Sequence, residues 1–106
     1  MSGRKDDNGK LDMTLLDDMP HALSAVVDIM QWAVTDKPAP YERGSWLNVH
    51  ADRYRAAVLR HNIAACKTDV ARFGVDDETG RLHLAHMAVS ALMALEITLR
   101  ESRSTN

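Results

Sequence analysis

The 106-residue chain has little of several features that mark familiar protein classes. A single cysteine, Cys66, excludes an internal disulfide framework and a cysteine-rich zinc site, and it favours a reducing cytoplasm. The charges nearly cancel, with a formal net of -2, so the chain lacks the basic excess of a nucleic-acid coat or a membrane-surface protein. No apolar run approaches the roughly 18–20 residues of a membrane span, and the polar N-terminus does not resemble a secretion signal. These absences favour a cytoplasmic globular protein.

The motifs of several enzyme classes are also missing. The sequence contains no Walker-type glycine loop, no strand-associated GxGxxG and no nucleophile-elbow serine. Cys66 is not expected to act as a nucleophile, because it falls on the main aliphatic stripe of its helix, where a thiol stays neutral. β-branched strand runs are absent and the apolar spacing is helical throughout. The sequence therefore predicts an all-α fold.

Three helical segments and two irregular connections account for the body of the chain. The first helix is expected to start near Asp17 or Asp18, either of which can cap it, with Pro20 in its first turn. The proline-rich residues 37–40 end it, because proline cannot continue the backbone ladder. The second helix is expected from about Asp52 to Phe73, closed by Gly74, and the third from after residues 76–80 to about Arg100.

One helical domain over residues 10–101 is the expected organisation. Residues 1–9 are predicted to be a mobile lead and residues 102–106 a short tail. A domain of this size buries only about 60–65% of the surface of its unfolded chain, so self-association would help to stabilise it. We therefore expect three main helices that are completed by a homodimer.

Both long helices have two partly apolar faces, and in each helix the histidines lie opposite the richest aliphatic stripe. At about 100° per residue, His61 falls across from the stripe of the second helix, and His83 and His86 fall across from that of the third. A helix with two such faces is usually wedged between two neighbours. We expect the two histidine faces to converge. The stripes consist of Ala56, Leu59, Ile63, Cys66, Val70 and Phe73, and of Leu84, Ala88, Ala91, Leu92, Leu95 and Leu99.

His83 and His86 are the strongest candidates for chemistry. Their spacing of three places both imidazoles on one helix face, where they can share a divalent metal or hold phosphate oxygens. Asp76, just before this helix, can add a carboxylate ligand. The alternative is a pair of polar or hydrogen-bonded interface residues, and two histidines without a third ligand are weak evidence for a metal.

A cationic ridge runs along the second helix, where Arg53, Arg60 and Lys67 recur at every seventh residue. Guanidinium groups bind phosphate through two hydrogen bonds, and His61, next to Arg60, can act as a donor or general base. The alternatives are a solvated charged face and a hydrogen-bonded interior histidine.

Two aromatic residues, Tyr41 and Trp46, lie in the first long connection, together with a glycine. On such a loop they can cover a nucleobase by stacking. The alternative is that Trp46 seals the core beneath the loop.

The order of these motifs resembles a family of small all-helical phage and prophage proteins, the dATP/dGTP diphosphohydrolase-like proteins. The resemblance covers about residues 10–99, and its second half is the more specific part. The matching residues are Lys10-Leu11-Asp12 with Leu15-Leu16, then Tyr41 and Trp46, Tyr54, Ala57 and Arg60-His61, Asp76-Asp77-Glu78-Thr79-Gly80, and His83-Leu84-Ala85-His86.

The resemblance implies hydrolysis of a purine deoxynucleoside triphosphate to the monophosphate and pyrophosphate, with a divalent metal such as Mg²⁺. It places Tyr41 and Trp46 near the site. It also places Ser90, a position at which the family usually has asparagine, among the residues that would hold the substrate. Its implied site is lined by Arg60, His61, Asp76, His83 and His86. The metal ligands that residue type and spacing indicate, Asp76, His83 and His86, belong to this set.

Two other functions remain open at this point. A non-catalytic phage protein of the same fold could sequester a nucleotide or inhibit a host defence protein, using the ridge and the aromatic loop as its contact surface. Alternatively, the histidine faces could form only a dimer interface. Turnover, nucleotide binding without turnover, and the absence of both would distinguish the three.

Overall fold

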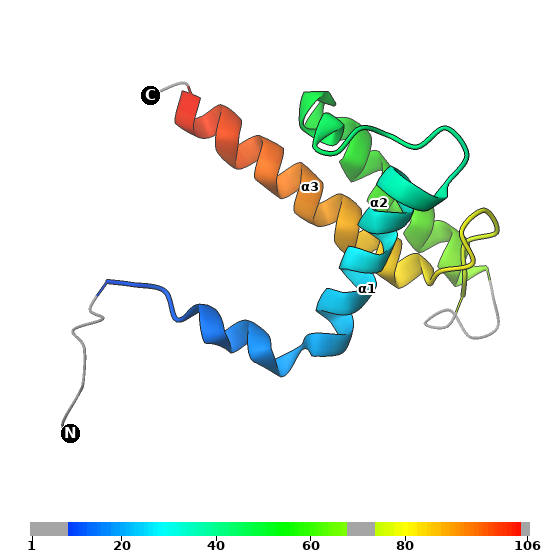
Figure 1. Ribbon diagram of the computed structural model, residues 1–106, viewed down its shortest axis with the longest axis horizontal. Coiled ribbons are helices and arrows are strands. Elements are labelled where there is room, and N and C mark those ends of the chain that lie inside the picture. The colour runs from blue at the N-terminus through cyan, green and yellow to red at the C-terminus, as the bar shows by residue number, and fades with distance from the viewer. Residues whose placement is uncertain (1–8, 68–73, 105–106) are drawn as a thin grey trace.

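The computed structural model describes residues 9–67 and 74–104 (Figure 1). Within these residues the chain forms no β-strand, only an isolated antiparallel bridge between Val75 and Leu82, and no helix is long and apolar enough to cross a membrane. The prediction of an all-α fold with three main helices is confirmed. The helices are α1 (Pro20–Gln31), α2 (Ala51–Cys66) and α3 (His83–Ser104), with shorter helical turns η1 (Met13–Asp18), η2 (Trp32–Asp36) and η3 (Ser45–Asn48).

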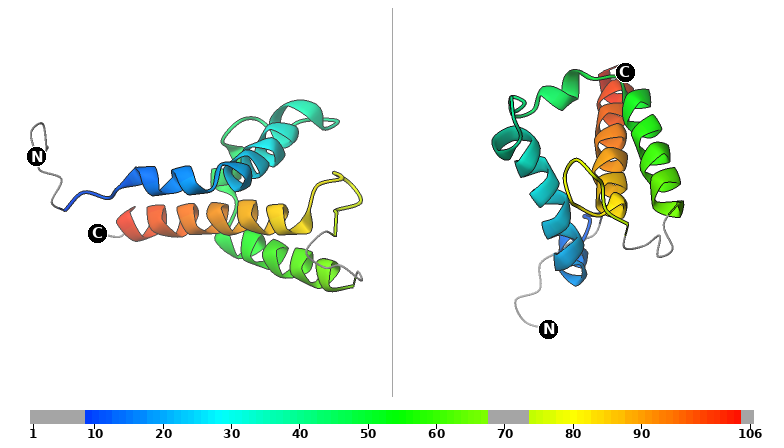
Figure 2. Two further views of the ribbon diagram at one scale, coloured as in Figure 1. Left: turned by 90° about the horizontal axis from the view of Figure 1, so that it is seen from below. Right: turned by 90° about the vertical axis from the view of Figure 1, so that its right-hand side faces the viewer.

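The longest helix, α3, lies between the other two, with α2 along one side and α1 on the other (Figure 2). The pair α2 and α3 is antiparallel, since Ala51 at the start of α2 packs against Ala94 and Ile97 late in α3. Trp46 and Tyr54 close this small cluster. The first long connection therefore anchors the far end of the helix pair, while the beginning of α3 lies beside the second half of α2.

Histidine and alanine, rather than leucine, face the interior of the α2–α3 pair. His83 is 8% exposed and Ala65 is also 8% exposed, whereas Leu59 and Leu95 are 62% and 53% exposed. Alanines let two helices approach closely, and buried imidazoles find hydrogen-bond partners there. Both aliphatic stripes consequently face outward within one chain. Cys66 is exposed as well. The expectation that its stripe would keep the thiol neutral assumed that this stripe faces the interior, and that assumption was wrong.

Several helix ends differ from the sequence prediction. Asp17 and Asp18 belong to η1, and α1 starts after Met19 without a side-chain cap, although Pro20 does occupy its first turn. The proline-rich connection ends the helix as predicted, with Lys37 already extended before Pro38. The predicted extension of the second helix over residues 68–73 lies outside the described residues, as does most of the predicted lead. Helix α3 continues past Arg100 to Ser104, into the predicted tail.

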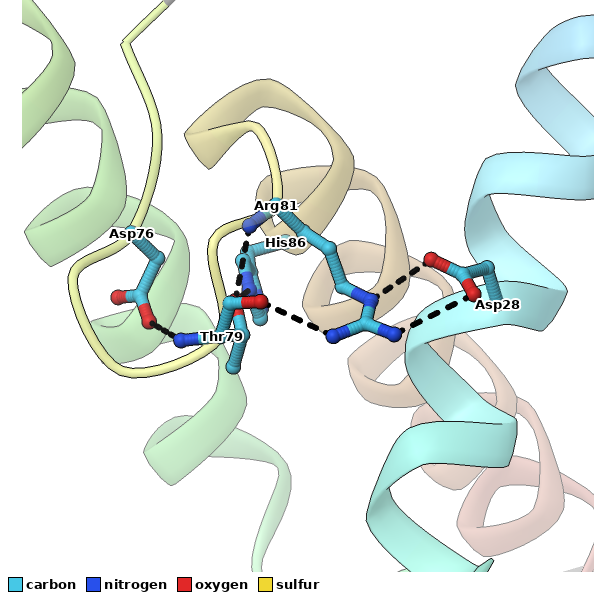
Figure 3. A network of polar contacts seen from close by, with 5 residues as sticks. All are labelled: Asp28, Asp76, Thr79, Arg81 and His86. Carbon is cyan, nitrogen blue, oxygen red and sulfur yellow. Dashed lines mark hydrogen bonds and ion pairs between the residues drawn. The ribbon is translucent and has the colours of Figure 1, made fainter. Parts of the chain in front are cut away.

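One ion pair joins α1 to the turn before α3. Arg81 Nε donates to Asp28 Oδ2 at 2.7 Å, and Nη2 donates to Oδ1 at 3.4 Å (Figure 3). The third guanidinium nitrogen, Nη1, donates to the backbone oxygen of Thr79 at 3.0 Å. The fork shape of the guanidinium thus ties α1 to the same turn that supports the histidines.

Candidate functional site

Three histidines from two helices meet between α2 and α3. The Nδ1 atoms of His61 and His83 lie 2.9 Å apart, and the rings of His61 and His86 stack with centroids 4.6 Å apart. At 2.9 Å one Nδ1 donates and the other accepts, so the two nitrogens cannot both carry a proton. The contact therefore requires that at least one of these two imidazoles is neutral.

A tight turn positions this cluster. The backbone N–H groups of Glu78 and Thr79 donate to Asp76 Oδ2 at 3.1 and 3.0 Å, and Gly80 takes the left-handed conformation, with φ of 71°. The turn brings Thr79 Oγ1 to 2.7 Å from His86 Nε2 (Figure 3). This contact fixes the orientation of the His86 ring. The turn that makes the contact is formed by the sequence motif Asp-x-Glu-Thr-Gly.

Burial and neighbouring charges lower the pKa of His61 and of His86 and so favour their neutral forms. Burial lowers the pKa of His61, and the nearby His86 and Arg60 lower it further. The pKa of His86 is also lowered, mainly by burial and against the opposing charge of Asp76. Burial alone would raise the pKa of Asp76, but the N–H of Thr79 and the imidazole of His86 lower it overall. At neutral pH the site thus combines neutral nitrogen bases with a carboxylate anion.

Three of these side chains could hold a metal ion. One ligand atom from each of His61, Asp76 and His83 lies within 4.8 Å of the other two. The sequence analysis named His86 as the third ligand, but this set contains His61 in its place. The Nε2 atom of His86 contacts Thr79 instead. Two imidazoles and one carboxylate suit zinc, iron, cobalt or manganese, whereas Mg²⁺ prefers oxygen ligands throughout. The donor set does not fit the magnesium that the family resemblance implies.

An aromatic pocket adjoins the cluster. It has a volume of about 810 Å³ and is lined by Trp32, Tyr41, Trp46 and Tyr54, among others, with His86 in its wall. This volume lies within the roughly 300–1,000 Å³ of small-molecule sites. His86 thus belongs to both the pocket and the histidine cluster.

Lys37 contacts two aromatic residues of the pocket wall. Its Nζ lies 3.7 Å from the ring centroid of Tyr41 and 5.8 Å from that of Trp32. Such cation–π contacts hold two aromatic rings on one side of the pocket. The loop that carries Tyr41 is thereby attached to the end of the α1–η2 segment.

The predicted substrate-binding residues separate into two groups. Tyr41, Trp46 and Ser90 line the pocket, but none of the ridge residues does so. Arg60 acts on the cluster only through its charge, which lowers the pKa of His61. The ridge residues Arg53, Arg60 and Lys67 are exposed along α2.

Several residues of the site were missed by the sequence analysis. Arg43 is a cation in the pocket wall, and Trp32 and Tyr54 add two aromatic rings. Arg43 immediately follows the tyrosine and glutamate of the aromatic loop, so the loop motif contained that signal. Arg81 pairs with Asp28 across 53 positions of sequence, and no local pattern indicates such a contact.

The lowered histidine pKa values predict that the fold loses stability in acid. Between about pH 6.5 and the lowered values, the unfolded chain binds more protons than the folded chain, so the stability is complete above about pH 6.5 and is lost as the pH falls. In buffer with a chelator, we expect the thermal midpoint, followed by circular dichroism, to fall from about pH 7.5 to about pH 5.5. His61→Gln should weaken this dependence, and His21→Gln, at an exposed histidine of α1, should retain it. An undiminished dependence in His61→Gln would contradict the account.

Comparison with known proteins assigns the chain to a family. A family model described as dATP/dGTP diphosphohydrolase, N-terminal, matches residues 1–106. No curated protein matches the chain, and no solved structure matches it. The family match covers the histidine cluster, the Asp76–Gly80 turn and the aromatic loop together. The chain belongs to the dATP/dGTP diphosphohydrolase N-terminal family.

Proposed function

We propose that this protein binds a purine deoxynucleoside triphosphate in the cytoplasm and hydrolyses it to the monophosphate and pyrophosphate. One observation carries the proposal: the aromatic pocket and the histidine cluster share His86. A base in the pocket therefore has its phosphates within reach of imidazoles and a carboxylate. The family membership supports the same chemistry.

The aromatic pocket is the proposed site of the base. Trp32, Tyr41 and Trp46 offer ring faces on which a planar purine can stack. Ser90 supplies a hydroxyl on the α3 wall that can hydrogen-bond to the sugar or the base.

Cationic residues inside and outside the pocket are proposed to hold the triphosphate. Arg43 lies in the pocket wall, and its guanidinium can bind phosphate oxygens through two hydrogen bonds. The exposed ridge of Arg53, Arg60 and Lys67 supplies positive charge outside the pocket, with Arg60 next to His61 along α2. This charge would draw the anionic substrate toward the cluster.

His86 is proposed to act as the base. Its lowered pKa leaves it neutral at physiological pH, and it lies outside the proposed metal ligands, so it can orient a water molecule and accept its proton. The water oxygen bonds to the α-phosphorus as the bond between that phosphorus and the α–β bridging oxygen breaks. Pyrophosphate leaves with the bonding electrons, and Arg43 offsets its charge.

For the metal, we propose a first-row transition ion held by His61, Asp76 and His83. Such an ion would supply charge neutralisation at the phosphates. Asp76 is already fixed by two backbone N–H groups, so the turn holds its carboxylate in place before any ligand arrives. Mg²⁺ would enter this scheme only with the nucleotide, through phosphate oxygens.

Nucleotide binding can be read directly from tryptophan fluorescence, because both tryptophans of the chain line the pocket. We expect dATP and dGTP to change the emission, and Arg43→Ala to weaken the binding of both. Arg103→Ala, at an exposed arginine near the end of α3, is the matched control and should bind as the wild type does.

Turnover is measured in the same samples as released pyrophosphate. His83→Ala should lower kcat by at least about 100-fold, while His21→Ala and His50→Ala, at exposed histidines outside the cluster, should retain activity. Fluorescence changes without pyrophosphate release would contradict the enzymatic proposal and favour a nucleotide-sequestering protein. The absence of both signals would contradict nucleotide binding and favour a protein that binds a host partner.

Metal selectivity is tested by equilibrium dialysis of the chelator-treated protein, followed by elemental analysis. We expect zinc and manganese to bind at one ion per chain, and His83→Ala and Asp76→Asn to lose this binding. His50→Ala should bind as the wild type does. Absence of bound ion in the wild type, or equal binding in His83→Ala, would contradict the proposed ligand set.

A further inference from the structure

Thr79 lies at the centre of the polar contacts that precede α3 (Figure 3). Its backbone N–H donates to Asp76 Oδ2 at 3.0 Å, and its backbone oxygen accepts from Arg81 Nη1 at 3.0 Å. Its hydroxyl oxygen, Oγ1, accepts from the backbone N–H of Arg81 at 3.2 Å and lies 2.7 Å from His86 Nε2. One residue thus joins a proposed metal ligand, an ion-paired arginine and the proposed base.

The position of Thr79 is set from two directions. The backbone N–H of Asp76 donates to the backbone oxygen of Arg81 at 2.8 Å, which closes the turn around Thr79. On the other side, the Arg81 guanidinium pairs with Asp28 of α1, and its central carbon lies 6.0 Å from the ring centroid of Trp32. Because Asp28 is 57% exposed, this ion pair adds little stability by itself. Its effect is to hold the turn in place against α1.

The contact with Thr79 occupies one of the two ring nitrogens of His86. Nε2 lies against Oγ1, whereas Nδ1 has no hydrogen-bond partner among the residues that the structure describes. One face of the ring is stacked on His61, with an interplanar angle of 7°. A neutral imidazole carries its proton on one nitrogen and accepts at the other. As the base, His86 therefore accepts through Nδ1, and its own proton lies on Nε2.

The Thr79 hydroxyl can accept a hydrogen bond from that Nε2–H group. A hydroxyl oxygen has two lone pairs, and the N–H of Arg81 uses only one of them. The second lone pair accepts from Nε2–H, and this hydrogen bond persists when the ring takes up a second proton at Nδ1. In a Ser-His-Asp triad, a carboxylate likewise holds the histidine in the reactive tautomer.

We propose that Thr79 is a positioning residue, which holds His86 through Nε2 and leaves Nδ1 as the nitrogen that accepts the proton of the attacking water. The inference rests on the proposed hydrolysis, to which it adds the reacting atom and the residue that selects it. The water gives its proton to Nδ1 while its oxygen bonds to the α-phosphorus. Pyrophosphate leaves with the electrons of the broken bond, and Nδ1 then releases its proton to solvent.

Removal of the hydroxyl tests this role. Thr79→Val keeps the size of the side chain and both backbone contacts of the residue. We expect kcat for pyrophosphate release to fall by about 10–100-fold, while nucleotide affinity by tryptophan fluorescence and zinc binding by dialysis stay as in the wild type. Thr79→Ser, which keeps a hydroxyl, should restore kcat. Thr98→Val, at an exposed threonine of α3, is the matched control and should behave as the wild type does.

These measurements separate the role of Thr79 from the proposed hydrolysis. Absence of pyrophosphate release by the wild type would contradict the hydrolysis and the inference together. An undiminished kcat in Thr79→Val would overturn the inference alone. An equal loss of kcat in Thr79→Ser, or a loss of zinc binding in Thr79→Val, would overturn it as well, because either result indicates a merely structural role.

Nitrogen-15 NMR of the wild type keeps the test decisive if Thr79→Val fails to fold. In chelator-treated protein at neutral pH, the chemical shifts distinguish a ring nitrogen that carries a proton from one that does not. We expect His86 to carry its proton on Nε2, and we expect Thr79→Ser to preserve this pattern. A proton on Nδ1 of His86 would overturn the inference, because the nitrogen facing the hydroxyl would then be the acceptor.

Discussion

Two imidazole nitrogens, on His61 of α2 and His83 of α3, lie 2.9 Å apart inside the helix pair, and their contact constrains the rest of the site. It fixes the register of the two antiparallel helices at the end where the Asp76–Gly80 turn enters. In that register His86 stacks on His61, and the Thr79 hydroxyl contacts the Nε2 atom of His86. The cost of burying these polar groups is offset only while each finds a partner, so the cluster, the turn and the Arg81–Asp28 ion pair support one another.

Placing histidines inside also explains where the leucines lie. A helix buries the face on which its neighbours can make close and satisfied contacts. In α2 and α3 that face consists largely of alanine and imidazole, together with Val89 and Ile97. The aliphatic stripes are left for water or for another surface. The same arrangement therefore creates a polar site within the chain and leaves leucine side chains exposed outside it.

Helical periodicity in the sequence was sufficient to predict the all-α fold and the convergence of the two histidine faces. Periodicity separates the faces of a helix, but it does not say which face turns inward, and here the richer aliphatic stripe does not. Local propensity placed the N-terminal cap of the first helix at Asp17 or Asp18. In the structure both residues belong to η1, and α1 begins at Pro20, after Met19. The ligand set could not be chosen from spacing, because the Thr79 contact that occupies His86 depends on the path of a turn.

The central claim is that one ligand site includes three of the five histidines of the chain. Nitrogen-15 NMR of the histidine side chains measures this directly, since His21 and His50 serve as internal controls in the same spectrum. On addition of dATP, the account predicts that the ring signals of His61, His83 and His86 move together while those of His21 and His50 stay in place. Unchanged signals from the three clustered histidines at saturating nucleotide would contradict it.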